Sequence, residues 1–346
     1  MKDDRFGRWC FSHVLNGQRE LADTLRMLVY KRNSELFEKL DFDNEECFLN
    51  PLLFAWFTDH GTVFPLERIF TEYSTERVSG TYRRITGTAT EIAACSHPLL
   101  DRFFVGAAGH ATHPEIEQAT QAHTAQLNRA FGVLQTHCPD IASAIASCTR
   151  KVMLFRAPEP NSFAAMSAHG MVFLNVPEWA DEVFFLEDLS HQCAHVLFNA
   201  MTFDKKRYLA IDPATMMSEV YGDSDEARTL YSAFHGLATY TLIVRVLSTL
   251  RGRSVLDRRQ QHELAGRLAF TLKKFGWDLR RLDKPGLFTA RGRLVYRRFA
   301  AMYEQGMASD GDLVEQLDVS NQPYNFDYAS FAARNPLEQP AEALAP

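Results

Sequence analysis

The chain has 346 residues, 46% of them hydrophobic, which is enough for one large or two ordinary globular domains with a sizeable core. Its formal net charge of -6 gives no electrostatic reason to expect binding to nucleic acid or to an anionic membrane. No apolar run follows Met1, and no segment reaches the roughly 18 consecutive apolar residues of a membrane span, so we expect a cytoplasmic protein without membrane contact.

The N-terminal part of the chain is expected to be helical. Residues 19–40 carry apolar residues at helical spacing with charged residues between them, which predicts an amphipathic helix. Aromatic and proline residues are dense over 48–70, and 71–90 is polar with two glycines, which indicates irregular connections and a short pair of strands. We therefore assign residues 1–110 to a helical N-terminal region.

Two helices and two strands are predicted next. A proline at the first helical position predicts a helix over 114–137, and a second helix is expected over 139–147. The short apolar runs 152–155 and 171–176 are predicted strands. We expect them to form a small antiparallel sheet, packed on a metal-bearing helix pair, in a mainly helical α+β fold.

His110 and His113 form a His-x-x-His pair before the first of these helices. The pair lies at a glycine-rich loop and a helix cap, and the pattern offers no third ligand, so we interpret it as structural and not as a metal site. Six cysteines without a CxxC pair predict free thiols, and neither a zinc ribbon nor a disulfide framework.

The stretch 184–198 is apolar nearly all the way round, which predicts a buried helix. It carries His191 and His195, and their spacing brings both rings onto one helix face, one turn apart. Two buried imidazoles without partners would cost several kcal/mol, and one metal ion satisfies both. The sequence therefore predicts half of a metal site, with ordinary core histidines as the alternative.

Three neighbours of these histidines bear on the chemistry. Gln192 stands where zinc peptidases carry a glutamate as general base, and an amide cannot take a proton from water. Asp188, one turn before His191, either fixes the tautomer of a histidine ring or is a solvated surface carboxylate. Cys193 points to a different helix face, so we interpret it as a packing residue.

A third metal ligand is expected downstream. After a loop of about 25 residues, a length that is usually functional, a largely apolar helix is predicted over 225–250. It holds His235, the only buried-looking histidine downstream, which we take as the third ligand. Arg228 lies seven residues earlier on the same predicted helix face, and an arginine facing a metal indicates an anionic ligand.

The C-terminal part is expected to add helices over 256–275 and 292–305. Residues 111–335 are assigned to one metal-binding catalytic domain. The end of the chain, 336–346, is rich in Pro, Ala and Glu and is predicted to be a disordered tail.

The order of these parts resembles the bacterial HExxH-motif peptide-modification proteins, described as 2-oxoglutarate-dependent HExxH-type peptide β-hydroxylases. The matching features are a helix such as 127–134 that ends near Pro139, two strands, the His-x-x-x-His helix, and an arginine-centred turn that leads to Leu-His-Gly. In this chain the last feature is similar to Phe234-His235-Gly236. The match spans roughly residues 120–250.

This resemblance implies that His191, His195 and His235 are the three ligands of an iron(II) ion. It also places Arg228 at the position of a recurrent arginine, which we expect to bind the distal carboxylate of 2-oxoglutarate. Arg245 is a weaker candidate because it lies about 80° away around the helix. Either arginine could instead belong to a structural ion pair.

We therefore expect a non-haem iron(II) oxygenase that uses 2-oxoglutarate and dioxygen to hydroxylate a carbon of a ribosomally made peptide. Three neutral imidazoles would leave positions open for the keto acid and for dioxygen. Gln192 departs from the Glu of the motif and argues against hydrolysis, whereas Thr229, in place of the usual proline, only loosens the alignment. The alternatives are a zincin-like zinc hydrolase, with a base such as Glu219, and a degenerate non-catalytic metal- or peptide-binding protein.

Overall fold

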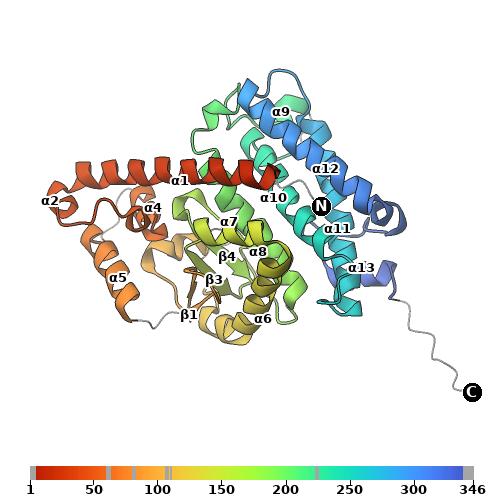
Figure 1. Ribbon diagram of the computed structural model, residues 1–346, viewed down its shortest axis with the longest axis horizontal. Helices are drawn as coiled ribbons and strands as arrows, with labels where there is room; N and C mark the ends of the chain where they lie inside the picture. Colours follow the sequence, from red (N-terminus) through yellow and green to blue (C-terminus); the bar gives the residue numbers. More distant parts are fainter. Residues whose placement is uncertain are drawn as a thin grey trace, which may run out of the picture.

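The computed structural model describes residues 5–337 with the exception of 60–63, 80–82, 106–108, 110 and 223–225. Over these residues the fold is mainly helical and of the α+β class, with one small four-stranded sheet. Figure 1 shows helix α1 (Arg5–Arg32) running across the molecule, from the helices of the C-terminal half to α4 and α5 at the other end. The prediction of a mainly helical α+β fold is confirmed.

The N-terminal region is helical, but its helices end at other places than predicted. The helix expected over 19–40 breaks at Asn33, whose side-chain oxygen accepts a hydrogen bond from the backbone N–H of Leu36 at 3.0 Å and so begins a new helix. The segment 71–90 is more regular than predicted, because its first half is helical. The elements after α1 are α2 (Ser34–Phe37), α3 (Glu45–Phe48), α4 (Pro51–Thr58), α5 (Leu66–Ser79) and the 3-10 helix η1 (Pro98–Phe103).

The sheet has the strand order β1-β2-β3-β4 and is mixed. Its first pair, β1 (Arg83–Arg84) with β2 (Glu91–Ala93), is antiparallel. The pairs β2 with β3 (Lys151–Phe155) and β3 with β4 (Met171–Asn175) are both parallel. The predicted antiparallel sheet is therefore wrong for the two strands on which it was based.

The connections explain why the central strands are parallel. Parallel neighbours need a crossover that returns the chain to the same end of the sheet. Helices α6 (Ile116–His137) and α7 (Pro139–Cys148) make this crossover between β2 and β3, and the segment 156–170 makes it between β3 and β4. Both β3 and β4 are buried on both faces, which fits their unbroken apolar sequences.

Helix α8 (Glu182–Met201), which carries two of the predicted ligands, lies between the sheet and the C-terminal helices. It contacts β4, α6 and α1, and its largest interface is with α10 (Leu230–Leu250). Asp181 caps α8 by accepting a hydrogen bond from the backbone N–H of Val183 at 2.9 Å. The other elements are η2 (Met166–Ala168), η3 (Lys205–Arg207), α9 (Met217–Tyr221), α11 (Arg258–Leu282), α12 (Ala290–Gln316) and α13 (Tyr328–Arg334).

The C-terminal helices are longer than predicted. α11 extends past the predicted end at 275, and α12 extends past 305, while α13 was not predicted. Residues from α1 to α13 contribute to one hydrophobic cluster. The predicted division of the chain into two regions at residue 110 stays a prediction. The predicted tail 336–346 lies outside the described residues from 338 onward.

Helix α10 is long and apolar enough to cross a membrane by length and composition alone. In the fold, however, 61% of its most apolar window is buried among the other helices. The central helix of a globular core has the same composition, because it is covered by apolar partners on all sides.

The packing of α1 on α8 gives a first prediction. A Cβ atom at Gly17 would lie 1.8 Å from the backbone oxygen of Ala200 in α8, so Gly17→Ala must push the two helices apart. We expect this substitution to lower the free energy of unfolding by about 3 kcal/mol, the upper range for overpacking. Urea unfolding followed by circular dichroism measures the change.

Gly132→Ala is the matched control, because Gly132 also lies in a helix but a Cβ there meets no atom within 4 Å. It should stabilise the protein by about 0.5–1 kcal/mol through helix propensity. A Gly17→Ala variant as stable as the Gly132→Ala variant would show that α1 does not pack on α8 at this distance.

Candidate functional site

The structure brings the three predicted histidine ligands together from α8 and α10. The rings of His191 and His195 lie one turn apart on α8, with ring centroids 5.0 Å apart. The His195 ring meets the His235 ring edge to face, with centroids 4.4 Å apart. Their nearest nitrogens, His195 Nδ1 and His235 Nε2, are 3.1 Å apart. All three residues are half-buried.

Burial keeps these imidazoles neutral. It lowers the pKa of His191 to about 4 and that of His195 to about 3, and it lowers the pKa of His235 well below the ordinary value. Neighbouring positive charge also lowers these pKa values: that of Lys274 acts on His191, and a protonated neighbouring histidine would act on each ring. Neutral imidazoles keep the nitrogen lone pairs that a metal ligand needs.

The donor set fits a divalent transition metal in its chemistry and in part of its geometry. Two metal–nitrogen bonds of about 2.0–2.1 Å place cis ligands about 3 Å apart, which agrees with the 3.1 Å between His195 Nδ1 and His235 Nε2. His235 Nε2 also lies 3.3 Å from the backbone oxygen of His195, so without a metal this ring can donate its N–H there. Among the described residues, no group of three or more His, Cys, Asp and Glu side chains is already arranged to hold a metal ion.

Gln192 is not directed at the histidines but at Asp188. Its side-chain amide donates a hydrogen bond to Asp188 Oδ1 at 3.1 Å, one turn back along α8. Burial raises the pKa of Asp188 to about 6, which excludes the prediction of a solvated surface carboxylate. The alternative, a carboxylate that fixes a histidine tautomer, also finds no support, because the described hydrogen-bond partners of Asp188 are Gln192 and Ser162 and no histidine is among them.

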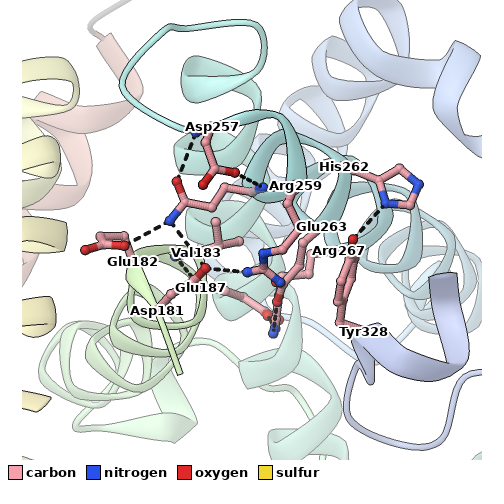
Figure 2. A network of polar contacts seen from close by, with 11 residues as sticks. Asp181, Glu182, Val183, Glu187, Asp257, Arg259, His262, Glu263, Arg267 and Tyr328 are labelled. Carbon is pink, nitrogen blue, oxygen red and sulfur yellow. Dashed lines mark hydrogen bonds and ion pairs between the residues drawn. The ribbon is translucent and has the colours of Figure 1, made fainter. Parts of the chain in front are cut away.

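A buried polar network fixes the first half of α8 against α11 (Figure 2). The Arg267 guanidinium in α11 contacts Glu187 of α8, one turn before His191, and also Glu263 at 2.7 Å. Arg259 contacts the α8 cap residue Asp181 and lies 2.9 Å from Glu263. Breaking such a buried pair costs about 3–5 kcal/mol, so the network holds α8, and with it the histidines, in one position.

Arg228 lies beside Gly236, the neighbour of His235 in the chain, but is already paired. Its guanidinium makes two hydrogen bonds of 2.7 Å to the two oxygens of Asp278 and two more to Glu226. Thr229 caps α10, so Arg228 precedes the helix and the predicted helical face does not apply to it. A carboxylate of a co-substrate would have to compete with Asp278 and Glu226, and the predicted role of Arg228 is not tested by these contacts.

Arg245 faces a different space from the histidines. It contacts Asp140 and lines an apolar pocket of about 60 Å³ between α1, α7, α8 and α10. Ala194, Phe198 and Ala238 also line this pocket, and none of the three predicted ligands does. The ion pair with Asp140 agrees with the structural alternative for Arg245.

The remaining candidates lie away from the cluster. His113 is exposed, and His110 falls outside the described residues. Cys193 is buried and packs against Thr149, whose hydroxyl lies 3.4 Å from its sulfur, as predicted for a packing residue. Glu219 is exposed on α9, and no hydrogen bond or ion pair among the described residues joins it to a histidine of the cluster.

Sequence reasoning missed two lysines whose charges reach the cluster. After burial, the charge of Lys274 contributes most to the lowered pKa of His191, and Lys205 contributes to that of His235. Lys274 belongs to a pair of adjacent lysines on α11, of which Lys273 is exposed and Lys274 half-buried. In the sequence, Lys273 and Lys274 differ only in their position relative to the apolar residues that recur at helical spacing along α11.

No protein-family model matches this chain, and no curated protein matches it. The resemblance described above therefore depends on the motif residues alone.

The raised pKa of Asp188 predicts a pH-dependent stability. The folded-state pKa of about 6 lies above the ordinary value of 3.8, so between these two pH values the folded protein holds a proton that the unfolded chain has lost. Stability contributed by this group is present at low pH and is lost as pH rises through this window, by about 3 kcal/mol in total. Asp188→Asn should therefore leave the stability of the metal-free protein nearly unchanged at pH 4 and increase it at pH 7.

Chemical denaturation at both pH values measures this difference, and all other titrating groups cancel because the two proteins share them. Glu219→Gln, which neutralises an exposed carboxylate, should show no such dependence. An Asp188→Asn variant that is less stable than its parent at pH 7 would show that Asp188 is ionised and stabilising in the fold.

Proposed function

We propose that this protein is a non-haem iron(II) oxygenase that uses 2-oxoglutarate and dioxygen to hydroxylate a carbon of a peptide. The observation that carries the proposal is the meeting of His195 Nδ1 and His235 Nε2 at 3.1 Å, two residues that are 40 positions apart in the chain and lie on different helices. His191 lies next to His195 on the same face of α8.

The protonation state of the cluster supports a metal site. Three neutral imidazoles have lone pairs to offer, and the 3.1 Å contact brings two of these nitrogens together. A divalent cation can replace the proton that such a pair shares in the metal-free protein. The proposal requires the half-buried His191 ring to rotate toward this pair, since its nitrogens make no described contact with either partner.

The two positions considered for a general base, Gln192 and Glu219, favour an oxygenase over a hydrolase. A zinc hydrolase needs a general base within hydrogen-bond reach of the attacking water. Gln192 has no basic group and is bonded to Asp188, while Glu219 is exposed on α9. When bound, iron(II) and 2-oxoglutarate would supply the oxidising chemistry, in which 2-oxoglutarate and dioxygen become succinate, carbon dioxide and one hydroxyl group on the substrate.

The chain itself then has three tasks. The imidazoles hold the cation and stay neutral because they are buried. The Arg267 network fixes the part of the α8 backbone that carries His191 and His195, while the His191 ring still has to rotate toward its partners. The half-buried face leaves access for a substrate. A peptide substrate is inferred from the resemblance of the motif residues, as are iron(II) and 2-oxoglutarate.

The histidine assignment predicts metal stoichiometry. The purified protein should bind one equivalent of iron(II) or cobalt(II), as measured by anaerobic calorimetry. His191→Ala, His195→Ala and His235→Ala should each weaken binding at least about 10-fold, because losing even an indirect partner of a metal ligand has this effect. His262→Ala is the control, since that half-buried ring bonds Tyr328 and not the cluster.

Full occupancy in the His235→Ala variant would show that the third ligand lies elsewhere. Equal loss in the His262→Ala control would show that the effect comes from unfolding, which thermal melts of each variant also monitor.

The proposed reaction predicts succinate release without knowledge of the peptide. With ascorbate supplying the two electrons that reduce the second oxygen atom to water in place of the peptide, the iron-loaded protein should convert 2-oxoglutarate slowly to succinate and carbon dioxide in air and not under argon, detected by mass spectrometry. Loaded with zinc, it should cleave neither casein nor mixed peptides, because Gln192 cannot act as a base. Zinc-dependent cleavage that is absent in the His195→Ala variant would contradict the oxygenase proposal and favour the hydrolase.

A further inference from the structure

A polar cavity of about 170 Å³ lies at the start of strands β2 and β3, and none of the three histidines lines it. Five of its lining residues are charged: Glu46, Arg84, Glu91, Arg150 and Lys151. The cavity is several times larger than the roughly 30 Å³ that one water molecule takes up. It therefore has room for a small polyatomic ligand, and solvent reaches it because Arg84 in its wall is exposed.

The register of the sheet brings three of these charges to one face. Arg84 is the partner of Glu91 in the antiparallel pair, and Glu91 is the partner of Lys151 in the parallel pair. Side chains of direct cross-strand partners lie on the same face of a sheet. Glu91 pairs with Lys151 at 2.9 Å, whereas Arg84 has no hydrogen bond or ion pair from its side chain to any described residue. The charge of Arg84 is therefore not compensated.

The guanidinium of Arg150 is the second cation with donors left over. Its nearest carboxylate, that of Glu46, lies 3.6 Å away, which is too long for a hydrogen bond. Only 24% of the Arg150 side chain is exposed, and within the described part of the chain its guanidinium donates no hydrogen bond. Polar groups that are covered to this extent are normally bonded. The five N–H donors of Arg150 are therefore available to a ligand in the cavity that it lines.

The balance of charge indicates the class of ligand. The walls carry three cationic and two anionic side chains, so one positive charge is in excess, and both carboxylates already have a cationic neighbour. A cationic ligand would meet this excess positive charge. An apolar ligand would leave both guanidinium groups without acceptors, which costs free energy. A carboxylate or phosphate group instead offers paired oxygens that match the fork of donors on a guanidinium.

We propose that this cavity binds a small oxyanion, the carboxylate or phosphate group of a ligand, through the guanidinium groups of Arg84 and Arg150. Lys151 stays paired with Glu91 and adds no free donor that the site requires. The inference involves none of the histidines and does not depend on the function proposed above, so it stands or falls by itself.

Two simple anions test the proposal. Isothermal titration calorimetry of the full-length protein, in a low-salt buffer free of both ions, gives the Kd of inorganic phosphate and of acetate. Arg84→Met and Arg150→Met should each weaken the binding of the preferred anion about 10- to 100-fold, because each removes charge-assisted hydrogen bonds. Added sodium chloride should weaken binding to the parent protein, since part of the site is exposed to solvent.

Arg83→Met is the matched control, because Arg83 is the exposed neighbour of Arg84 in β1 and does not line the cavity. Successive side chains of a strand point to opposite faces, so this variant should keep the parent Kd. Arg84→Lys keeps the charge without the fork and should recover part of the affinity. His195→Ala should also bind as the parent does. Thermal melts report on the fold, and Arg150→Gln replaces Arg150→Met if the latter is unstable.

The outcomes decide both the site and the kind of anion. Arginine-dependent binding that is tighter for phosphate indicates a phosphorylated ligand, and tighter binding of acetate indicates a carboxylate ligand. The inference is overturned if the parent protein binds neither ion, or if folded Arg84→Met and Arg150→Met variants bind as tightly as the parent. An equal loss in Arg83→Met would show a general effect of surface charge, and a loss in His195→Ala would place the anion at the histidine cluster. Both results also overturn it.

Discussion

The position of α8 depends on the buried guanidinium of Arg267. This side chain joins Glu187, one turn before His191, to Glu263 on its own helix, and Glu263 is fully buried. Burial and, to a smaller extent, the charge of Asp181 raise the pKa of Glu263, and the charge of Arg267 opposes this effect. Each buried charge of the network would be left uncompensated without its partners. The network therefore stabilises one arrangement of α8 on α11.

This constraint explains how an apolar helix can present polar rings. α8 is covered by the sheet, α6 and α1 on its other sides, so the face that carries His191 and His195 is directed toward α10. His235 comes from the first half of α10, after the Thr229 cap, and meets His195 there. The imidazoles themselves are neutral, because burial lowers the pKa of each. Such a cluster can offer nitrogen lone pairs to a cation.

The parts of the fold that follow local rules could be predicted from the sequence. The periodic or unbroken apolar segments gave α6, α7, α8, α10, β3 and β4, and the His-x-x-x-His spacing placed two rings on one face of α8. The relative direction of β3 and β4 could not be predicted, because it depends on the connecting segment 156–170. Its sequence does not indicate whether the chain re-enters the sheet at the same end or at the opposite end. Asn33 and Thr229 cap helices at positions that differ from the predicted helix ends. Because Thr229 caps α10, Arg228 lies before this helix and not within it.

The polar surroundings of the site were less predictable still. Gln192 was interpreted by its place in a motif, but its partner is Asp188 on the same helix. The pairing of Arg228 with Asp278 joins residues 50 positions apart, and Arg267 pairs with Glu187 over 80 positions. Ion pairs between distant helices leave no periodic signal, so a sequence identifies the charged residues without showing which of them neutralise one another.

The central claim is that the three histidines bind one iron(II) ion that also takes a 2-oxo acid. The most direct measurement is an anaerobic titration of the protein with iron(II) and 2-oxoglutarate, followed by visible absorption. We predict a charge-transfer band that requires both components, saturates at one iron per chain and is lost in the His195→Ala variant. Failure to retain one equivalent of iron(II), or a band that persists without His195, would contradict the claim.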